Sequence, residues 1–295
     1  MKNLFIASLI LFSVSAFAQE SLVVDMVPQT TDNATQISYV VLIPQAKLKG
    51  VENNWNSHLS KDSKGRSSDD DGVHSQDNML VKNISPDRFE IYSKMSETEK
   101  GVHLNVWLTQ NGRALVSKTP ESALDLAAKK YVYDFAITQY REAVQAELKK
   151  EQAKQKKMEG DLADLLKAKE QSMETVNENE REEKKTSAAI AVTNKDIDNA
   201  ALDIHDQKQM VKTTASDPNA KKGAEKTLDN MEDDKKDLQK DNKKKNEQLD
   251  DLKKENRKEE RAMNTNEQNV ALKTAAIEAQ KQTVHDVTAK LGNIK

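Results

Sequence analysis

The stretch from Ile190 to Leu238, IAVTNKDIDNAALDIHDQKQMVKTTASDPNAKKGAEKTLDNMEDDKKDL, contains two apolar columns on either side of a turn signal. In each column, apolar residues recur every seven positions in a segment otherwise rich in Lys, Asp, Asn and Gln. A seven-residue apolar repeat is typical of a left-handed coiled coil. The first column extends back to Leu148 and the second forward to Leu291. The C-terminal part of the chain, residues 121–292, is therefore predicted to consist of two long helices.

The turn signal between the columns predicts that the helices fold back on each other. Asp217 suits the position that caps a helix N-terminus, and Pro218 suits the first helical residue. The alternative, one continuous helix through Pro218, costs about 3 kcal/mol for an interior proline. We therefore predict a helical hairpin with arms at 121–214 and 218–292 and a tip at 215–218. Folding about the tip places Ile204 opposite Met231, Ile197 opposite Leu238, Leu165 opposite Val270, and Val144 opposite Leu291.

This pairing predicts a seam between the arms and a set of tip residues. The tip residues are Ser216, Asp217 and Pro218. The seam residues are Val144, Leu148, Leu162, Leu165, Val176, Ile190, Ile197, Ile204, Val211, Leu228, Met231, Leu238, Leu249, Leu252, Met263, Val270, Ile277, Val284 and Leu291.

The middle of the predicted seam is polar. Asn179 and Glu183 on the outward arm are expected to meet Asn256 and Leu252 on the return arm, and Lys169 to meet Asn266. Polar seam residues can fix register or partner number. In the simpler interpretation, which we favour, long aliphatic stems cover the seam and its centre is loose. Because polar layers weaken a two-helix coil, a second copy of the chain is one expected partner.

Composition supports long helices attached to a small globular part. The chain has 295 residues, of which 32% are charged and only 4% aromatic. It has no cysteine, which excludes disulfides, thiolate metal sites and a cysteine nucleophile. Its 46 basic and 49 acidic residues leave a net charge of -3, so no strong field points to nucleic acid or to an anionic membrane.

The N-terminal residues 1–18 have the pattern of a signal peptide. Lys2 is followed by the apolar run Leu4 to Phe12 and by the small-residue cleavage pattern Ala16-Phe17-Ala18. An uncleaved N-terminal anchor is the less favoured alternative, because the apolar run is short for a bilayer. We expect an exported protein whose mature chain begins at Gln19, in the periplasm first and outside the cell second. No integral membrane segment is expected after cleavage.

Residues 19–120 predict a small α+β head with an antiparallel sheet. The helix expected at 47–61 places Leu48, Val51, Trp55 and Leu59 on one face. A polar stretch at 61–76 is predicted to be an exposed loop, and Asn111-Gly112 a tight turn. Strands are predicted at 22–27, 36–43, 78–83, 88–95 and 102–109, with a brief pairing at 114–116.

The segment after the head predicts a helix shared between the two parts of the chain. Thr119 suits an N-cap, with Pro120 and Glu121 in the first turn. From Leu124 to Tyr140 the helix is apolar nearly all round, which indicates burial. We expect it to pack on the sheet as far as about Ala143 and then to continue as the first arm, the one arm anchored in the head.

Motifs for chemistry are weak. Asp69-Asp70-Asp71-Gly72 resembles the start of a calcium loop, but the twelfth position is Asn78 instead of a bidentate glutamate, so a solvated acidic loop is favoured. Trp107 either covers the second face of the sheet or marks a binding surface, and we favour the core. No phosphate loop or nucleophile motif is present, and we expect no catalytic, cofactor-binding or metal-binding residues. The histidines His58, His74, His103, His205 and His285 show no ligand spacing.

Several of these segments resemble those of a group of secreted bacterial proteins that join a small α+β domain to a long C-terminal coiled coil. The resemblance lies in the signal peptide, the helix around Trp55, Phe89-Glu90-Ile91-Tyr92, Asn111-Gly112 and Tyr131-Val132-Tyr133-Asp134-Phe135-Ala136. It implies the fold and no particular activity. In shape alone, the chain is also similar to periplasmic chaperones that carry helical hairpins on a small β body, although those lack this domain order.

The sequence predicts a non-catalytic exported protein that acts as a spacer or protein–protein docking scaffold in the cell envelope. One alternative is a holdase-type chaperone that grips unfolded clients with its hairpin arms. A second, less favoured alternative is an enzyme or ligand-binding site in the head. The expected partners are other proteins, including a second copy, and not nucleic acid.

Overall fold

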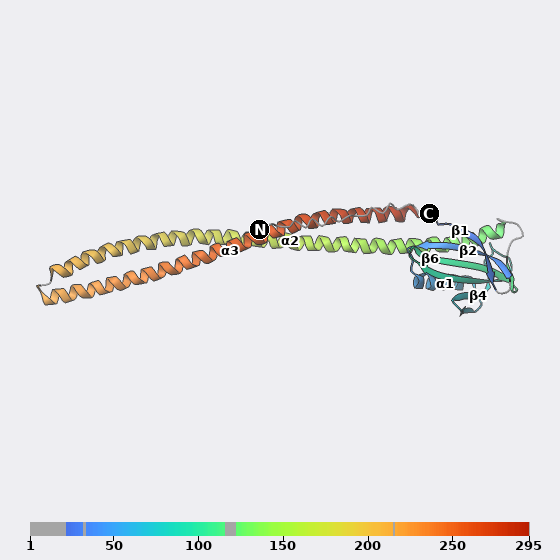
Figure 1. Ribbon diagram of the computed structural model, residues 1–295, viewed down its shortest axis with the longest axis horizontal. Helices are drawn as coiled ribbons and strands as arrows, with labels where there is room; N and C mark the ends of the chain where they lie inside the picture. The colour runs from blue at the N-terminus through green and yellow to red at the C-terminus, as the bar shows by residue number, and fades with distance from the viewer. Residues whose placement is uncertain (1–21, 32–33, 116–121, 215, 295) are drawn as a thin grey trace. The chain divides into compact units, whose positions relative to one another are not determined.

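A computed structural model describes residues 22–31, 34–115, 122–214 and 216–294. An antiparallel sheet is followed by two long helices that pack against each other, α2 (Ala123–Thr213, 91 residues) and α3 (Pro218–Asn293, 76 residues) (Figure 1). The predicted fold class, an α+β head followed by an antiparallel helical hairpin, is confirmed. One continuous helix through Pro218 is wrong, because α3 begins at that residue.

The chain forms two compact units. Unit 1 contains the described residues up to Lys154 together with those from Gln280 onward, and unit 2 is Gln155–Ala279. Unit 1 therefore holds the sheet, the first part of α2 and the last part of α3. The signal-peptide prediction for residues 1–18 and the helix start predicted at Thr119 to Glu121 lie outside the described residues.

The sheet has the order β1-β2-β6-β5-β4-β3, with β7 paired to β6. Every pairing is antiparallel. The predicted strands at 36–43, 88–95 and 102–109 correspond to β2, β5 and β6. Asn111 and Gly112 form the turn between β6 and β7 with φ values of 52° and 72°. The strands are β1 (Val24–Thr31), β2 (Ala34–Pro44), β3 (Ser67–Asp70), β4 (Val73–Met79), β5 (Phe89–Thr98), β6 (Gly101–Gln110) and β7 (Arg113–Ala114).

The exposed loop predicted at 61–76 is wrong. Most of it is the hairpin β3–β4, whose turn at Asp71 and Gly72 has φ values of 52° and 74°. Such positive φ values at both turn residues match the twist of a two-residue hairpin. The strand predicted at 78–83 ends instead at Met79. The polar sequence has low strand propensity, and pairing with β5 overrides it, because propensity yields to tertiary context.

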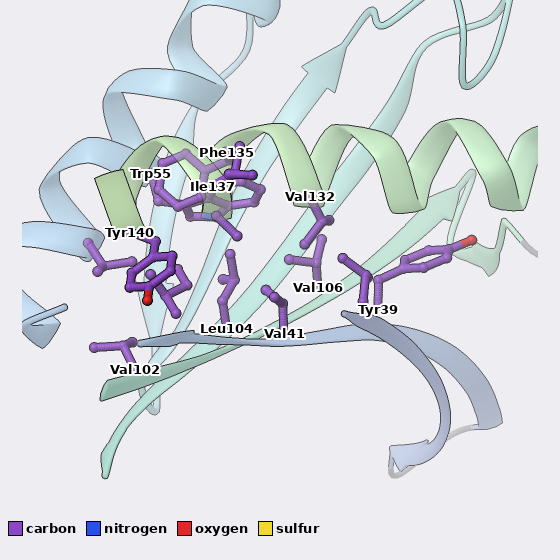
Figure 2. Close-up of a cluster of buried hydrophobic side chains, with 14 of the residues drawn as sticks. Tyr39, Val41, Trp55, Val102, Leu104, Val106, Val132, Phe135, Ile137 and Tyr140 are labelled. Carbon is purple, nitrogen blue, oxygen red and sulfur yellow. The ribbon is translucent and has the colours of Figure 1, made fainter. Parts of the chain in front are cut away.

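One face of the sheet is covered by α1 (Leu48–Asp62) and the first turns of α2. Val51, Trp55 and Leu59 are buried, as their spacing predicts. Figure 2 shows Trp55, Val132 and Phe135 from the two helices pointing toward side chains of β2 and β6. The strands contribute the alternate residues Tyr39, Val41, Ile43, Val102, Leu104 and Val106, each at most 1% exposed.

The second face of the sheet carries Trp107, which the strand alternation places opposite Val106. Trp107 is 6% exposed, and its ring stacks on Tyr92 with the centroids 5.8 Å apart and the planes at 9°. The hydroxyl of Thr109 donates to Glu90 on the same face. Trp107 is thus buried, but it lies outside the core cluster under the helices.

The start of α2 is tied to the sheet by a buried carboxylate. Ser122 Oγ accepts a hydrogen bond from the Asp125 backbone N–H, while Asp125 Oδ2 accepts one from the Ser122 N–H. This reciprocal arrangement is a capping box. The hydroxyl of Tyr39 on β2 donates to Asp125 Oδ1 at 3.0 Å. The described part of α2 begins at Ala123, directly after this capping box.

Candidate functional site: the helical hairpin

Each of the predicted seam residues is buried or half-buried. In unit 2, Ile204 and Ile277 are the most deeply buried, at 7% and 5% exposure. In unit 1, Val144 is fully buried. The other apolar seam residues, such as Val176 and Leu252, are half-buried. A two-helix seam covers its side chains from one side only, so half-burial follows from the architecture.

Contacts between the arms fix their register in unit 2. Lys169 Nζ lies 3.1 Å from Glu267 Oε1, and Lys273 Nζ lies 2.9 Å from Asp161 Oδ2. Lys169 was expected opposite Asn266, so the observed level agrees within one residue. Toward the tip, Lys208 pairs with Glu232 at 2.8 Å. The first two contacts agree with the fold-back register read from the heptads within one residue, whereas Glu232 lies five residues from Thr227, the position that this register places opposite Lys208.

Hydrogen bonds cross the polar middle of the seam. Asn256 Nδ2 donates to Glu183 Oε1 at 2.7 Å, and Lys245 Nζ donates to the buried Thr193 hydroxyl at 2.9 Å. Asn256 was expected opposite Asn179, one helical turn away from Glu183. The Asn256 Oδ1 and Asn179 Nδ2 atoms are both buried without a hydrogen-bond partner among the described residues. The centre of the seam is thus polar and incompletely satisfied.

At the turn between the arms, Ser216 and Asp217 precede Pro218, the first residue of α3. Asp217 Oδ1 accepts hydrogen bonds from the backbone N–H groups of Asn219 and Ala220, at 3.0 and 3.3 Å. These bonds cap α3, whose first residue is Pro218. Ser216 is exposed and makes no side-chain hydrogen bond within the described part of the chain. Asp217 therefore has a structural role in ending the turn.

In unit 1, both arms belong to the head's core, whereas the sequence predicted that only the first arm is anchored. Val287 and Ile294 of α3 join the same core cluster as Val144 of α2. Arg141 donates to the Ile294 carbonyl oxygen through Nε and Nη2, at 3.3 and 2.9 Å. The one-arm interpretation is wrong because the apolar residues at the end of α3 bury against α2 next to the sheet.

His58 of α1 is a titratable group enclosed by aromatic rings in the head. Its ring lies between Trp55, Tyr131 and Phe135, with centroid distances of 5.7, 4.8 and 5.3 Å. Its Nε2 atom is buried without a hydrogen-bond partner among the described residues. Desolvation by this burial lowers the pKa of His58 below its usual 6.5, against the opposing attraction of Asp62.

Two tyrosine hydroxyls, of the buried Tyr39 and the half-buried Tyr131, make hydrogen bonds in the same core. Burial, and then the charge and hydrogen bond of Asp125, raise the pKa of Tyr39 well above its usual value. Burial raises the pKa of Tyr131 in the same way, and its hydroxyl donates to Asp62 at 3.1 Å. Both hydroxyls stay protonated and serve as hydrogen-bond donors that join strand or helix to helix.

The other candidate sites from the sequence are dispersed. Asp69 Oδ1 lies 2.8 Å from His74 Nδ1 within the β3–β4 hairpin, which is not the helix-flanked loop of a calcium site. The described residues contain no group of three or more His, Asp or Glu side chains placed to hold a metal ion. Among those residues, no helix is long and apolar enough to cross a membrane.

No family model, no curated protein and no solved structure matches this chain.

Proposed function

We propose that this chain is a non-catalytic exported protein whose hairpin acts as a spacer and protein–protein docking scaffold in the cell envelope. The observation that carries the proposal is the difference between the inner and outer faces of the two arms in unit 2. The inner faces of its two arms contact each other, and their outer faces present charged residues to solvent. The part of α2 in unit 2, Gln155–Thr213, rises about 90 Å at 1.5 Å per residue, which gives a long surface for partners.

Photo-crosslinking on the full-length chain tests this proposal in the producing cells. A photoreactive residue replaces Lys244 or Lys258, both exposed on α3, and a matched control carries it at the buried Val287. The expected result is a specific protein adduct from the exposed positions and none from the control. If no exposed hairpin position gave an adduct, the proposed docking function would be wrong. Intact mass of the exported protein should show Gln19 as its first residue.

The chaperone alternative is favoured by large apolar side chains exposed in unit 2. Leu202 and Leu272 are 66% and 71% exposed, and Met173 and Met210 are also exposed. Single exposed apolar residues are common on soluble proteins, so they support a weaker proposal. The test is whether the purified chain suppresses the aggregation of an unfolded outer-membrane protein, measured by light scattering. Suppression that Leu202→Lys and Leu272→Lys together abolish would favour the chaperone function.

A further inference from the structure

The most deeply buried residues of unit 2 include polar ones. Among the described residues of this unit, those at least nine-tenths buried are the apolar Ile204, Ala224 and Ile277 and the polar Thr186, Thr193 and Asn256. A buried polar residue in a coiled-coil seam costs stability and specifies register and the number of helices that associate. The burial of these three residues therefore indicates a role in specificity.

The polar residues belong to a continuous part of the seam. In the register read from the heptads, each of five successive layers contains at least one polar residue. These layers are Asn179–Asn256, Glu183–Leu252, Thr186–Leu249, Ile190–Lys245 and Thr193–Asn242. We call residues 179–193 of α2 and 242–256 of α3 the polar segment. Purely apolar layers lie beyond it on both sides, such as Leu165–Val270 and Ile197–Leu238.

Two charged side chains of the polar segment make hydrogen bonds across the seam and still reach water. Glu183 accepts a hydrogen bond from Asn256, and Lys245 donates one to Thr193. Lys245 Nζ also lies 2.6 Å from Asp241 Oδ2 on its own helix, and 28% of the Lys245 side chain is exposed. Glu183 is half-buried as well. A two-helix seam leaves its flanks open, so both charges keep part of their hydration.

A second hairpin packed on the seam would remove that hydration. Burying a charge is costly unless its partners compensate fully, and the polar segment already holds the unpaired atoms Asn179 Nδ2 and Asn256 Oδ1. The apolar layers on either side have the opposite preference, because half-buried Leu, Ile and Val side chains gain from further burial. Four-helix bundles form from such apolar layers. The polar segment therefore opposes an association that the rest of the seam favours.

We propose that the polar segment selects the number of helices in the seam. It confines the apolar side of each arm to the other arm of the same chain, and it prevents two hairpins from merging seam to seam into a four-helix bundle. A second copy of the chain, which the sequence predicts as one partner, is thereby excluded from the seam. The inference concerns self-association and stands independently of the proposed docking function.

Sedimentation of the full-length variant N179L/E183L/K245L/N256L tests the proposal. These four changes complete three apolar layers and remove the unpaired amide atoms. Because the cost of burying charges is gone, the seam-to-seam association constant should be at least about tenfold higher than that of the unaltered chain. The midpoint of urea unfolding should also rise, since well-packed apolar residues replace incompletely satisfied polar ones.

A control variant separates the seam from added apolar surface. N177L/E178L/K254L/N264L makes the same four types of exchange at exposed positions and completes no seam layer. Scattered exposed apolar residues are tolerated by soluble proteins, so the control should associate no more strongly than the unaltered chain. If the seam variant associated no more strongly than the unaltered chain, or if the control gained as much, the selector role would be wrong. A lower urea midpoint for the seam variant would also contradict it.

Discussion

Replacing Trp55 by alanine should destabilise unit 1 more than any surface change in the head. Trp55 of α1 is fully buried, and its ring lies edge-on to Phe135 of α2 with the centroids 4.7 Å apart. Its Nε1 donates to Ser93 Oγ on β5 at 2.8 Å. One side chain therefore joins both helices to the sheet, as Figure 2 shows for its contact with α2.

The expected cost has two parts. Removing a buried tryptophan ring costs about 3–5 kcal/mol through lost burial and the cavity that remains. Losing the hydrogen bond to Ser93, which is 1% exposed, contributes about 1 kcal/mol of this total. Trp55→Phe keeps most of the ring but not the donor, so its cost should lie between those of Trp55→Ala and the unaltered chain.

Urea unfolding followed by the fluorescence of Trp107 measures these changes, because Trp107 remains as the sole tryptophan in both variants. Leu126→Ala is a suitable control, since Leu126 lies on α2 and is 57% exposed. It should change the unfolding free energy by less than about 0.5 kcal/mol. If Trp55→Ala cost no more than Leu126→Ala, the assignment of Trp55 as the central contact of the head would be wrong.

Three further changes test other parts of the fold. Val287→Asp should release the end of α3 from the core of unit 1. The expected result is faster amide hydrogen exchange over residues 280–294. Unchanged exchange there would contradict anchoring of the second arm. Because the pKa of His58 is lowered in the folded state, the unfolded state binds more protons below pH 6.5. The free energy of unfolding should therefore fall from pH 7 to pH 5. Urea unfolding at each pH should show a smaller fall for His58→Phe than for the unaltered chain. Cysteines replacing Ile197 and Leu238, in a chain that otherwise has none, should form a disulfide within one chain, and a disulfide found only between chains would contradict the hairpin.

The hairpin was predictable because its signals are periodic and long. A seven-residue apolar repeat continued over many turns specifies which face is buried, and the Asp217-Pro218 pair specifies where the chain reverses. Antiparallel pairing about a known turn then leaves one register. The contacts Lys169–Glu267 and Asp161–Lys273 agree with that register within one residue. Strands with alternating or β-branched residues, such as β2 and β6, were predictable for the same reason.

The features that sequence reasoning missed depend on partners distant in the chain. β3 and β4 are polar, so no pattern marks them as strands, and they form because β5 offers a free edge for pairing. Burial of Val287 in the head's core depends on the level at which α3 returns beside α2. The predicted register places Leu291 opposite Val144 at the base of the hairpin. Apolar side chains that meet at this base extend the core of the head instead of ending it.

The polar middle of the seam is where pattern and structure differ in a way that bears on function. The heptads place Asn179 opposite Asn256, but Asn256 bonds to Glu183, whose longer side chain reaches across one turn. A hydrogen bond across the seam fixes the level of the arms, while it contributes less stability than apolar packing would. A weak but well-registered centre is therefore consistent with a hairpin that presents its outer faces to partners.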